Sequence, residues 1–528
     1  MLKIYDVPVF YFPKFFHPDP TVKRQSGFLA PTFINSSNQS SVFTLPYYHA
    51  ISDSKDLTLS PRFYSTNKFL TQLEYRSVYA KSKHIIDFST LNQKNENSKN
   101  HFFSESSGEI NLDNFEKSEI SLQLQSTSND TYLKSYKLDS PIINDTDTLV
   151  SSFNFSAYRS DLAIKSYLTV YEDLSESKKS DKYEYVYPAF NITKELYTSL
   201  NSFGDLNLNS NGYMKNHNTN IFEKVLVNDL LFSSYPSFNK SGLKNNFNIL
   251  FKNTNTDSKN SKKYKNNLNT KLSTLFEYNS SYPLQKKGDN YTNIIKPIIS
   301  LRYSPNNSKN MRDEERRIDA NNIFSLNRIS SNESVEGGGS FSFGTEFNKN
   351  DELNNEIFSG KIANVFRFEE DKNLPTSSSL GKKTSDIVGS INYNPNKYFS
   401  INYEFSEDES LKNTNYQLLK NEFKVNNFIS TFEYLNENNT IKNESYLSNK
   451  TVFKLSNSTS LGFEARENKK TRATEFYNLI YEYRNDCLIA AIQYNKDYYI
   501  DRDYKPSENV FLMLTIIPFG ETKSPNIK

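Results

Sequence analysis

The chain has 528 residues, enough for two or three ordinary domains or for one very large barrel. Its 63 Lys and Arg residues nearly balance 61 Asp and Glu residues, and a net charge of +2 without a long basic block gives no electrostatic support for nucleic-acid binding. A mean hydropathy of −0.71 and the lack of any run of about 20 apolar residues argue against transmembrane helices.

Aromatic side chains narrow the fold class further. They make up 14% of the chain, with 36 Tyr, 40 Phe and no Trp, which excludes a largely disordered protein. A membrane-spanning β-barrel combines low hydropathy with many aromatics, because only the outward half of each strand must be apolar. A secreted β-solenoid with polar faces would give similar averages, so composition permits the barrel without requiring it.

The N-terminal stretch MLKIYDVPVFYFPKFF does not have the pattern of a signal peptide, because prolines interrupt its apolar run and no small-residue cleavage site follows. The following segments alternate like β-strands but carry Pro31, Pro46 and Pro61. Proline has no backbone N–H, so it is confined to the edges, starts and bulges of strands. We therefore expect the sheet to begin with a weak seam.

From Gly27 onward, short segments alternate apolar and polar residues between turns rich in Asn, Ser, Asp and Lys. Clear examples are residues 71–79, 120–125, 401–406 and 431–435. A period of two places successive side chains on opposite faces of a sheet. Because no long stretch keeps an apolar stripe at helical spacing, the sequence predicts an all-β chain.

The length then predicts the number of strands. A tilted membrane strand takes about 9–11 residues, and with its share of the connections it uses roughly 20. The chain would therefore supply about 24–26 strands, near the top of the ordinary range for single-chain barrels. The predicted fold is a single large antiparallel transmembrane β-barrel. Independent β-sandwiches are the alternative, but they would require more continuous hydrophobic strands.

Three blocks of sequence carry a family resemblance. The first contains PVFYFP at 8–13, HPD at 17–19, RQSGFL at 24–29 and LPYY at 45–48. The second contains KPIISLRYSP at 296–305, NNIFSLNR at 321–328 and VEGG at 335–338. The third contains YEYRNDCL at 481–488, DRD at 501–503 and NVFLMLTIIPFG at 509–520. All three resemble the barrel domain of the LptD (OstA) family of lipopolysaccharide-assembly proteins.

The resemblance implies an outer-membrane translocon that exports and inserts lipopolysaccharide. The glycan would pass through a polar lumen, and the acyl chains would leave through a lateral gate between the first and last strands. It also implies an LptE-like plug lipoprotein in the lumen and an LptA-like periplasmic bridge that docks on an N-terminal β-domain. We assign residues 1–22 to the end of that periplasmic domain or its linker, 23–520 to the barrel and 521–528 to a C-terminal tail. The rest of the periplasmic domain and the signal peptide are expected upstream, in a longer protein.

The gate is expected where the last strand, 510–519, closes against residues 27–36. Each proline in the first strands removes a ladder hydrogen bond worth roughly 0.5–1.5 kcal/mol net. A passive diffusion porin or substrate-specific channel is the alternative function, but it has no need for weakened closing strands. The residues assigned to the seam are Gly27, Pro31, Phe33, Pro46, Leu514 and Pro518.

Polar segments at 92–100, 253–269 and 311–319 are too long for tight turns, and barrels usually place such loops outside. Solvated loops are the simpler interpretation. The alternative is that four lysines in the second segment meet lipopolysaccharide phosphates through charge-assisted hydrogen bonds. These residues are Lys259, Lys262, Lys263 and Lys265.

Cys487 is the single cysteine of the sequence, so no disulfide can form within this chain. One interpretation is a small hydrophobe at a strand end. The family resemblance implies instead a cysteine that bonds to the N-terminal periplasmic domain.

No motif predicts an enzyme, a metal site or a cofactor. The five histidines are scattered, with no HExxH pattern and no GxSxG elbow. The glycines 337–339 lack the Lys and Ser or Thr of a phosphate loop and are expected in a turn or bulge. A Ser–His lipase triad could still be assembled in space, although no serine stands out.

Overall fold

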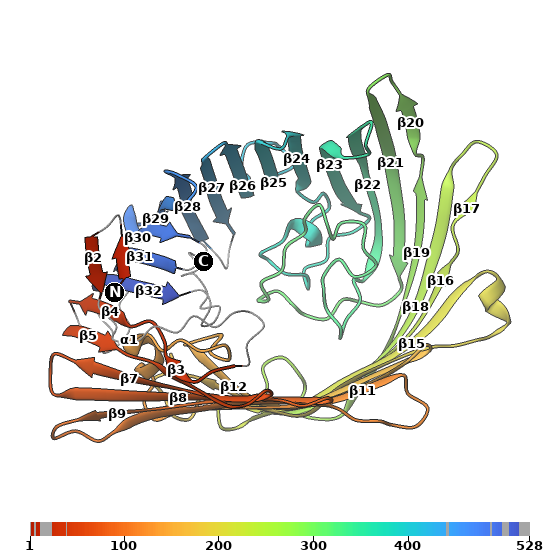
Figure 1. Cartoon of the computed structure of the whole chain (residues 1–528). Helices are drawn as coiled ribbons and strands as arrows, with labels where there is room; N and C mark the ends of the chain where they lie inside the picture. Colours follow the sequence, from red (N-terminus) through yellow and green to blue (C-terminus); the bar gives the residue numbers. More distant parts are fainter. Residues whose placement is uncertain are drawn as a thin grey trace.

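The computed structural model describes residues 2–4, 7–10, 24–37, 40–439, 443–485, 488–498 and 506–516. These residues form a closed antiparallel β-barrel of 26 strands and a separate two-stranded sheet near the N-terminus (Figure 1). The predicted all-β fold and the predicted number of strands are therefore confirmed. Within the described residues, no helix is both long enough and apolar enough to cross a membrane.

The strands follow one another around the wall in chain order. Some positions hold two short strands: β3 continues β4, β6 continues β5, β17 extends β16 and β20 extends β19. The separate sheet contains β1 (Leu2–Ile4) and β2 (Val7–Phe10). The first half of the wall contains β3 (Gly27–Phe28), β4 (Thr32–Ser36), β5 (Ser40–Thr44), β6 (Tyr47–Ser52), β7 (Lys55–Tyr64), β8 (Lys68–Val78), β9 (Ser82–Gln93), β10 (Lys99–Glu109), β11 (Lys117–Thr127), β12 (Thr148–Arg159), β13 (Leu162–Asp173), β14 (Tyr183–Glu195), β15 (Gly204–His217), β16 (Ile221–Ser234), β17 (Ser237–Phe238) and β18 (Lys244–Lys259).

The second half completes the barrel. It contains β19 (Asn269–Ser281), β20 (Leu284–Lys287), β21 (Tyr291–Ser304), β22 (Gly338–Asp351), β23 (Glu356–Arg367), β24 (Ile387–Asn396), β25 (Phe399–Glu407), β26 (Thr414–Val425), β27 (Phe428–Asn438), β28 (Asn443–Lys454), β29 (Thr459–Asn468), β30 (Ala473–Arg484), β31 (Leu488–Asp497) and β32 (Ser507–Ile516). Three short helices lie in the connections: α1 (Tyr132–Tyr136), η1 (Ser199–Ser202) and η2 (Ser379–Gly381).

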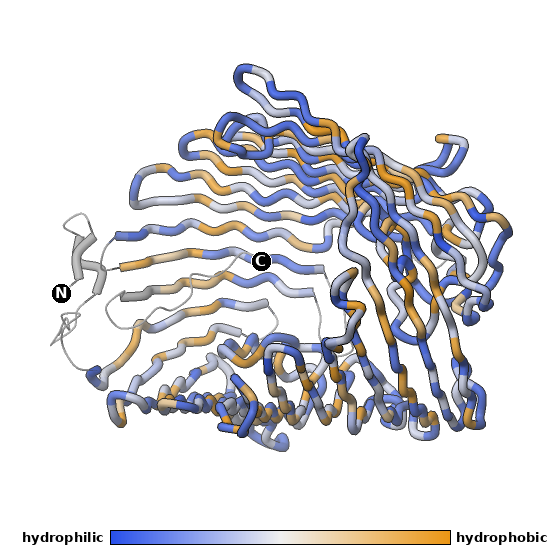
Figure 2. Tube along the Cα trace, turned by 90° about the vertical axis from the view of Figure 1, so that its right-hand side faces the viewer, coloured by the Kyte–Doolittle hydropathy of each residue, from blue (hydrophilic) through white to orange (hydrophobic). Residues whose placement is uncertain are grey.

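Alternation along the strands separates an outward face from a luminal face, and Figure 2 shows hydrophobic and hydrophilic residues alternating along the strands that face the viewer. On β10, Phe102 is 42% exposed whereas its neighbour Phe103 is fully buried. Outward apolar side chains are exposed because they lie on the outer surface of the wall. An apolar outer band around a polar interior is the pattern of a membrane barrel.

The packed core lies inside the barrel, where long connections at one end of the strands fold back onto the luminal face. The connection 128–147, which carries α1, packs on the wall from β5 to β12 and against Leu174, which follows β13. The connections 305–337 and 368–386 form a second cluster against β23 and β24. Figure 1 shows the connection between β21 and β22 as a mass of loop inside the ring of strands.

The predicted solvated loops are wrong in two respects. Met311 and Ile318 are 2% and 1% exposed, so segment 311–319 belongs to the luminal core and not to the outer surface. Alternating Asn and Thr residues continue β18 to Lys259, which leaves only residues 260–268 of segment 253–269 outside the strands. Asn and Thr suit this strand because its inner face is polar.

Candidate functional site

The closing seam joins the last strand, β32, to the first, β4, and it is incomplete. On its other side β32 pairs with β31 along its whole length, from Ser507–Asp497 to Ile516–Leu488. Among the described residues, the pairing with β4 extends only from Asn509–Ser36 to Met513–Thr32. The backbone from Leu514 to Ile516 therefore has a β partner on one side only. The end of the seam that carries this unpaired edge is the end nearest Pro31.

The three prolines lie where the first strands break. Pro31 separates β3 from β4, and Pro46 separates β5 from β6. Pro61 lies within β7 opposite the second break, and its carbonyl accepts a hydrogen bond of 3.3 Å from the Leu45 N–H. The breaks thus fall side by side on neighbouring strands, because each proline removes a ladder donor at a similar height in the wall.

The seam residues divide between the two faces of the wall. Phe33 and Leu512 are directly paired, both are 42% exposed, and they lie on the outward face. Ile34 and Phe511 form the neighbouring pair and face the lumen. The outward row continues onto β5 and β7 through Phe43 and Phe63, so apolar surface crosses the seam without interruption; their rings stack 6.5 Å apart.

The structure places most of the predicted seam residues at this junction. Gly27 pairs with Tyr48 in the short β3–β6 ladder, and a Cβ at Gly27 would meet no atom within 4 Å. The partner of Phe33 is Leu512, whereas Leu514 lies two residues farther along and pairs with Ala490 of β31. Pro518 and Cys487 lie outside the described residues.

A buried ionic cluster fixes the connection 305–337 to the inside of the wall. Glu336 accepts hydrogen bonds from Arg328 Nε at 2.9 Å and Arg328 Nη2 at 2.5 Å, and from Arg367 Nη1. Arg328 also donates to the hydroxyls of Ser340 and Ser342 on β22. Burial opposes ionisation of Glu336, but the nearby guanidinium groups outweigh it and hold its pKa below the ordinary value.

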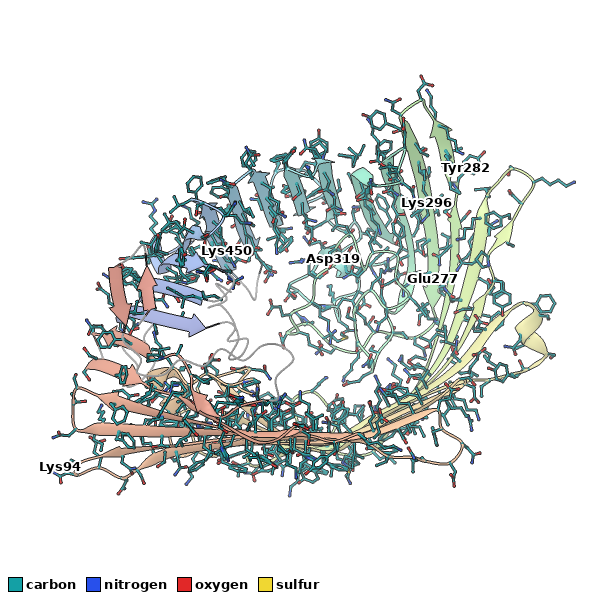
Figure 3. All side chains as sticks on the ribbon, in the orientation of Figure 1. Lys94, Glu277, Tyr282, Lys296, Asp319 and Lys450 are labelled. Carbon is teal, nitrogen blue, oxygen red and sulfur yellow. The ribbon has the colours of Figure 1, made fainter. Side chains whose placement is uncertain are left out.

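Arg302 joins the cluster from β21. Its guanidinium donates to the carbonyl oxygens of Ser325 and Leu326, and it lies 4.0 Å from the carboxylates of Glu277 and Glu336. Figure 3 shows Glu277 on the wall, next to the mass of luminal loop that contains Asp319. Wall and loop charges therefore neutralise each other where water is excluded, which makes the attachment costly to break.

The opposite part of the same connection is attached to a distant section of the wall. The guanidinium of Arg317 lies 3.3 Å from the ring centroid of Tyr416 on β26, and its Nη1 lies 3.5 Å from Glu437 on β27. The connection thus bridges β21–β23 and β26–β27 across the inside of the barrel. It narrows this part of the lumen as a fixed structure.

The lysines proposed as phosphate contacts are exposed at the end of β18 and in residues 260–268. Among them, Lys263 is 3.1 Å from Glu333, which also binds Lys309 at 2.8 Å. Burial raises the pKa of Glu333, but the two lysines outweigh it and lower the value to about 2. Lys263 therefore already serves to attach connection 260–268 to connection 305–337.

A cavity of about 280 Å³ lies between connection 305–337 and the wall. Apolar side chains of both line it, including Leu250 and Ile329, and so do Lys252 and Asp229. These two charged groups bind each other at 2.7 Å, and Lys252 also donates to the Asn332 carbonyl oxygen. The charged groups of the cavity are therefore used in holding the loop.

Sequence reasoning missed a buried polar network on β8–β10. The Ser89 hydroxyl lies 2.6 Å from His101 Nδ1, and His101 Nε2 lies 3.1 Å from Asp87 Oδ1. The residue types are those of a hydrolase triad, yet all three are fully buried and the Tyr132 hydroxyl of α1 covers Ser89 at 2.8 Å. With no route for a substrate, the arrangement serves to attach α1 to the wall. Direct cross-strand pairing of His101 with Ser89 produces it, and no spacing motif could have revealed it.

The glycine run at 337–339 has a structural role. A Cβ at Gly337 would meet the Asn306 carbonyl oxygen at 2.3 Å, and Gly338 has a φ of +75°, which favours glycine. The predicted turn or bulge is wrong, because Gly338 and Gly339 begin β22 and pair in regular register with Ser304 and Tyr303. Among the described residues, no group of three or more His, Cys, Asp or Glu side chains could hold a metal ion.

Comparison with solved structures finds matches of low similarity. The FrpB iron transporter from Neisseria meningitidis aligns over 93% of this chain and 81% of its own, with 7% identity and a TM-score of 0.34. The ferric preacinetobactin receptor BauA from Acinetobacter baumannii aligns with a TM-score of 0.29 and 7% identity, covering 93% of this chain and 80% of its own. Scores this low carry no argument about the present chain.

Comparison with sequences is more informative. The LPS-assembly protein LptD of Pseudomonas aeruginosa (strain UCBPP-PA14) is 34% identical over 95 residues, which are 18% of this chain and 10% of that protein. The LPS-assembly protein LptD of Shewanella sp. (strain MR-4) is 39% identical over 75 residues, or 14% of this chain and 10% of its own length. The matched part thus spans about a tenth of each relative. The model of the family described as LPS transport system D matches residues 97–466, more than half of the chain. The chain therefore belongs to the LptD family.

Proposed function

We propose that this barrel is an outer-membrane translocon that exports lipopolysaccharide and inserts it through a lateral opening between β32 and β4. Family membership supports the substrate class, and the large barrel supports a place in the outer membrane. Lipopolysaccharide poses a physical problem, because its acyl chains belong in lipid and its charged glycan must reach the outside. A fully paired barrel satisfies every backbone group but offers the acyl chains no lateral exit.

The observation that carries the proposal is the incomplete seam. Pairing between β4 and β32 ends at Thr32–Met513, next to Pro31, while β32 continues to Ile516. Each missing ladder bond lowers the cost of separating the strands by roughly 0.5–1.5 kcal/mol, and by more where water cannot replace it. Opening is therefore cheapest at the end of the seam that carries the prolines. The acyl chains would leave there.

The lumen would provide the path of the glycan. Buried polar residues line the inner face of many strands. Of the two luminal clusters described above, the one with connection 128–147 reaches the seam, and the one with connections 305–337 and 368–386 does not. An LptE-like plug lipoprotein would complete the interior. An LptA-like bridge would deliver the substrate through the periplasmic domain of which residues 1–22 are proposed to be the end. Cys487 is proposed to bond to a cysteine of that domain. The protein itself would perform no chemistry.

Locking the seam tests the proposal. Cysteines at Phe33 and Leu512 face each other on the outward side, so oxidation would link β4 to β32 without filling the lumen. We expect the oxidised variant to lose lipopolysaccharide export and to regain it on reduction. The matched control places cysteines at Tyr481 and Ile492, a directly paired, exposed couple in the complete β30–β31 seam, and should export normally in both states.

Full export through a barrel whose Phe33–Leu512 crosslink is verified would refute the lateral opening. If that barrel also conducted small solutes with the seam locked, the porin alternative would be favoured. The proposed phosphate contacts give a second, independent test, from which Lys263 is left out because it already binds Glu333. Replacing Lys259, Lys262 and Lys265 with Gln should weaken binding of lipopolysaccharide but not of its dephosphorylated form, if they contact phosphates as proposed.

A further inference from the structure

The inside of the closing seam is covered by a segment from a distant part of the sequence. Ile34 of β4 and Phe511 of β32 are directly paired and face the lumen. Ile34 packs against the hydrophobic cluster that contains Tyr136 and Leu138 of connection 128–147. Phe511 lies under Lys137 of the same connection, with Nζ 5.2 Å from the ring centroid. The hydrophobic cluster to which this segment belongs therefore reaches β4, and the segment itself contacts β32 through Lys137.

The covered residues form a continuous luminal row. Phe511 pairs with Ile34, Ile34 with Val42, and Val42 with Tyr64, so the row crosses from β32 through β4 and β5 to β7. The ring of Tyr136 packs edge-on against Tyr64, with centroids 6.1 Å apart. The cover thus extends across the seam and two strands beyond it.

The segment is firmly attached on the β4 side of the seam. Arg62 of β7 donates to the carbonyl oxygens of Tyr136 and Lys137, at 2.9 and 3.4 Å. Gln72 of β8 donates to the Asp139 carbonyl oxygen at 3.0 Å. Tyr132, Leu133 and Leu138 fill the cluster beneath, with exposed fractions from 0 to 6%.

On the β32 side the segment is attached through the contact of the Lys137 cation with the Phe511 ring. Lys137 has a φ of +45° at the C-terminal end of α1, a backbone conformation that directs it away from the helix toward β32. Burial lowers the pKa of Lys137, and Asp497 at the end of β31 opposes that shift. The side chain thus sits over Phe511 next to an acidic group. This is the part of the cover that can be released without unfolding the cluster.

We propose that connection 128–147 is an internal strap that holds the paired part of the seam closed and is released at Lys137 when the seam opens fully. The inference rests on the lateral opening proposed above and adds the element that regulates it. The end of the seam at Pro31 and Leu514 lies beyond the strap and separates first. The part between Thr32 and Ser36 separates only when Lys137 leaves Phe511. Movement of one luminal loop would then set the width of the opening.

Spin labels on the outward row can test the strap in the purified barrel. Phe43 and Ile492 lie on the strands flanking the seam, in one row with Phe33 and Leu512. They are separated by three interstrand spacings of about 4.8 Å when the seam is closed. The whole barrel, reconstituted in lipid bilayers, should give a dominant short distance.

Two variants release the strap by different routes. Lys137→Met removes the cation but keeps the aliphatic stem, and Arg62→Met removes the donors that hold the strap to β7. Lys137→Met should raise the population of longer distances on the order of tenfold, the factor to which a desolvated cation–π contact corresponds. Arg62→Met should raise it by a similar factor, because it removes the hydrogen bonds from a charged donor to the strap. Lys137→Arg should restore the distance distribution of the unaltered protein. The control Lys349→Met removes a cation from the Tyr291 ring elsewhere in the wall and should change nothing.

Distance distributions unchanged in both Lys137→Met and Arg62→Met would overturn the strap. Heat-dependent mobility on gels establishes that each barrel is folded. If one of the two variants fails to assemble, the other still tests the strap by a different route. The measurement does not involve export. A seam that widens in these variants while a locked seam still exports would refute the lateral opening and leave the strap intact. Unchanged distance distributions in both variants, together with loss of export from the locked seam, would refute the strap and leave the lateral opening intact.

Discussion

The attachment of connection 305–337 gives the sharpest prediction about stability. Glu336→Gln preserves the size of the side chain and removes its charge, while the positive charges of Arg328, Arg367 and Arg302 remain around it. Glu336 is 4% exposed, so solvent cannot replace the lost carboxylate. Removing one partner of a buried ion pair costs about 3–5 kcal/mol, because the other charge is left without compensation.

The loss of free energy should destabilise connection 305–337 rather than the whole barrel. The wall keeps its ladder hydrogen bonds, whereas the loop loses the group that joins it to β23. A change of about 3–5 kcal/mol corresponds to a rise of roughly 10² to several thousandfold in the open population of the loop. Trypsin cleavage after the arginines of residues 305–337, measured where opening is faster than cleavage, should accelerate by that factor.

Glu346→Gln is the matched control. Its carboxylate also binds two cations, Lys296 at 3.0 Å and Lys361 at 3.2 Å, but the side chain is 26% exposed. Exposed ion pairs contribute about 0–1 kcal/mol, so this variant should change the cleavage rate less than fivefold. A Glu336→Gln barrel cleaved within threefold of the unaltered rate would refute the assignment of the ionic cluster as the anchor of the loop.

Three further predictions concern the loops and the seam. The pKa of Glu333 is lowered to about 2, so its ion pairs stabilise the loop fully above the ordinary value near 4.5, and this contribution should be lost as pH falls from 4.5 toward 2. Peptic cleavage of the loop across that range should show the loss, and Glu333→Gln should remove the pH dependence. Arg317→Ala should free the far end of the loop from Tyr416, raising conductance in planar bilayers; unchanged conductance would show that this contact does not narrow the lumen. Replacing Pro31 and Pro46 with Ala restores two backbone donors and should slow export, measured as newly inserted lipopolysaccharide, while export at the original rate would exclude the prolines as weakening elements.

Much of the wall could be predicted from the sequence. Alternation with a period of two is local, and it identified strands such as 401–406, which lies in β25, and 71–79, all but the last residue of which lies in β8. Prolines mark interrupted ladders wherever they occur, and Pro31 and Pro46 do separate short strands. The number of strands followed from the length, because membrane thickness fixes the length of each strand.

The interior could not be predicted in the same way. Segment 311–319, MRDEERRID, has the composition of a solvated loop, yet Arg316 and Arg317 bind partners within the barrel. Charges can be buried there because the wall supplies complementary groups from distant strands. Composition reports the polarity of a segment, but it contains no information about which surface will compensate that polarity.

Local features of the sequence predicted an all-β chain with interrupted first strands, since periodicity and proline act through the local backbone. The exact partners at the closure, such as Phe33 with Leu512, depend on the tertiary structure. It also decided that connection 128–147 covers the joined strands, with Lys137 over Phe511. These residues lie hundreds of positions apart. Only closure of the ring brings β4, connection 128–147 and β32 to one place, so no local pattern could have predicted their contact.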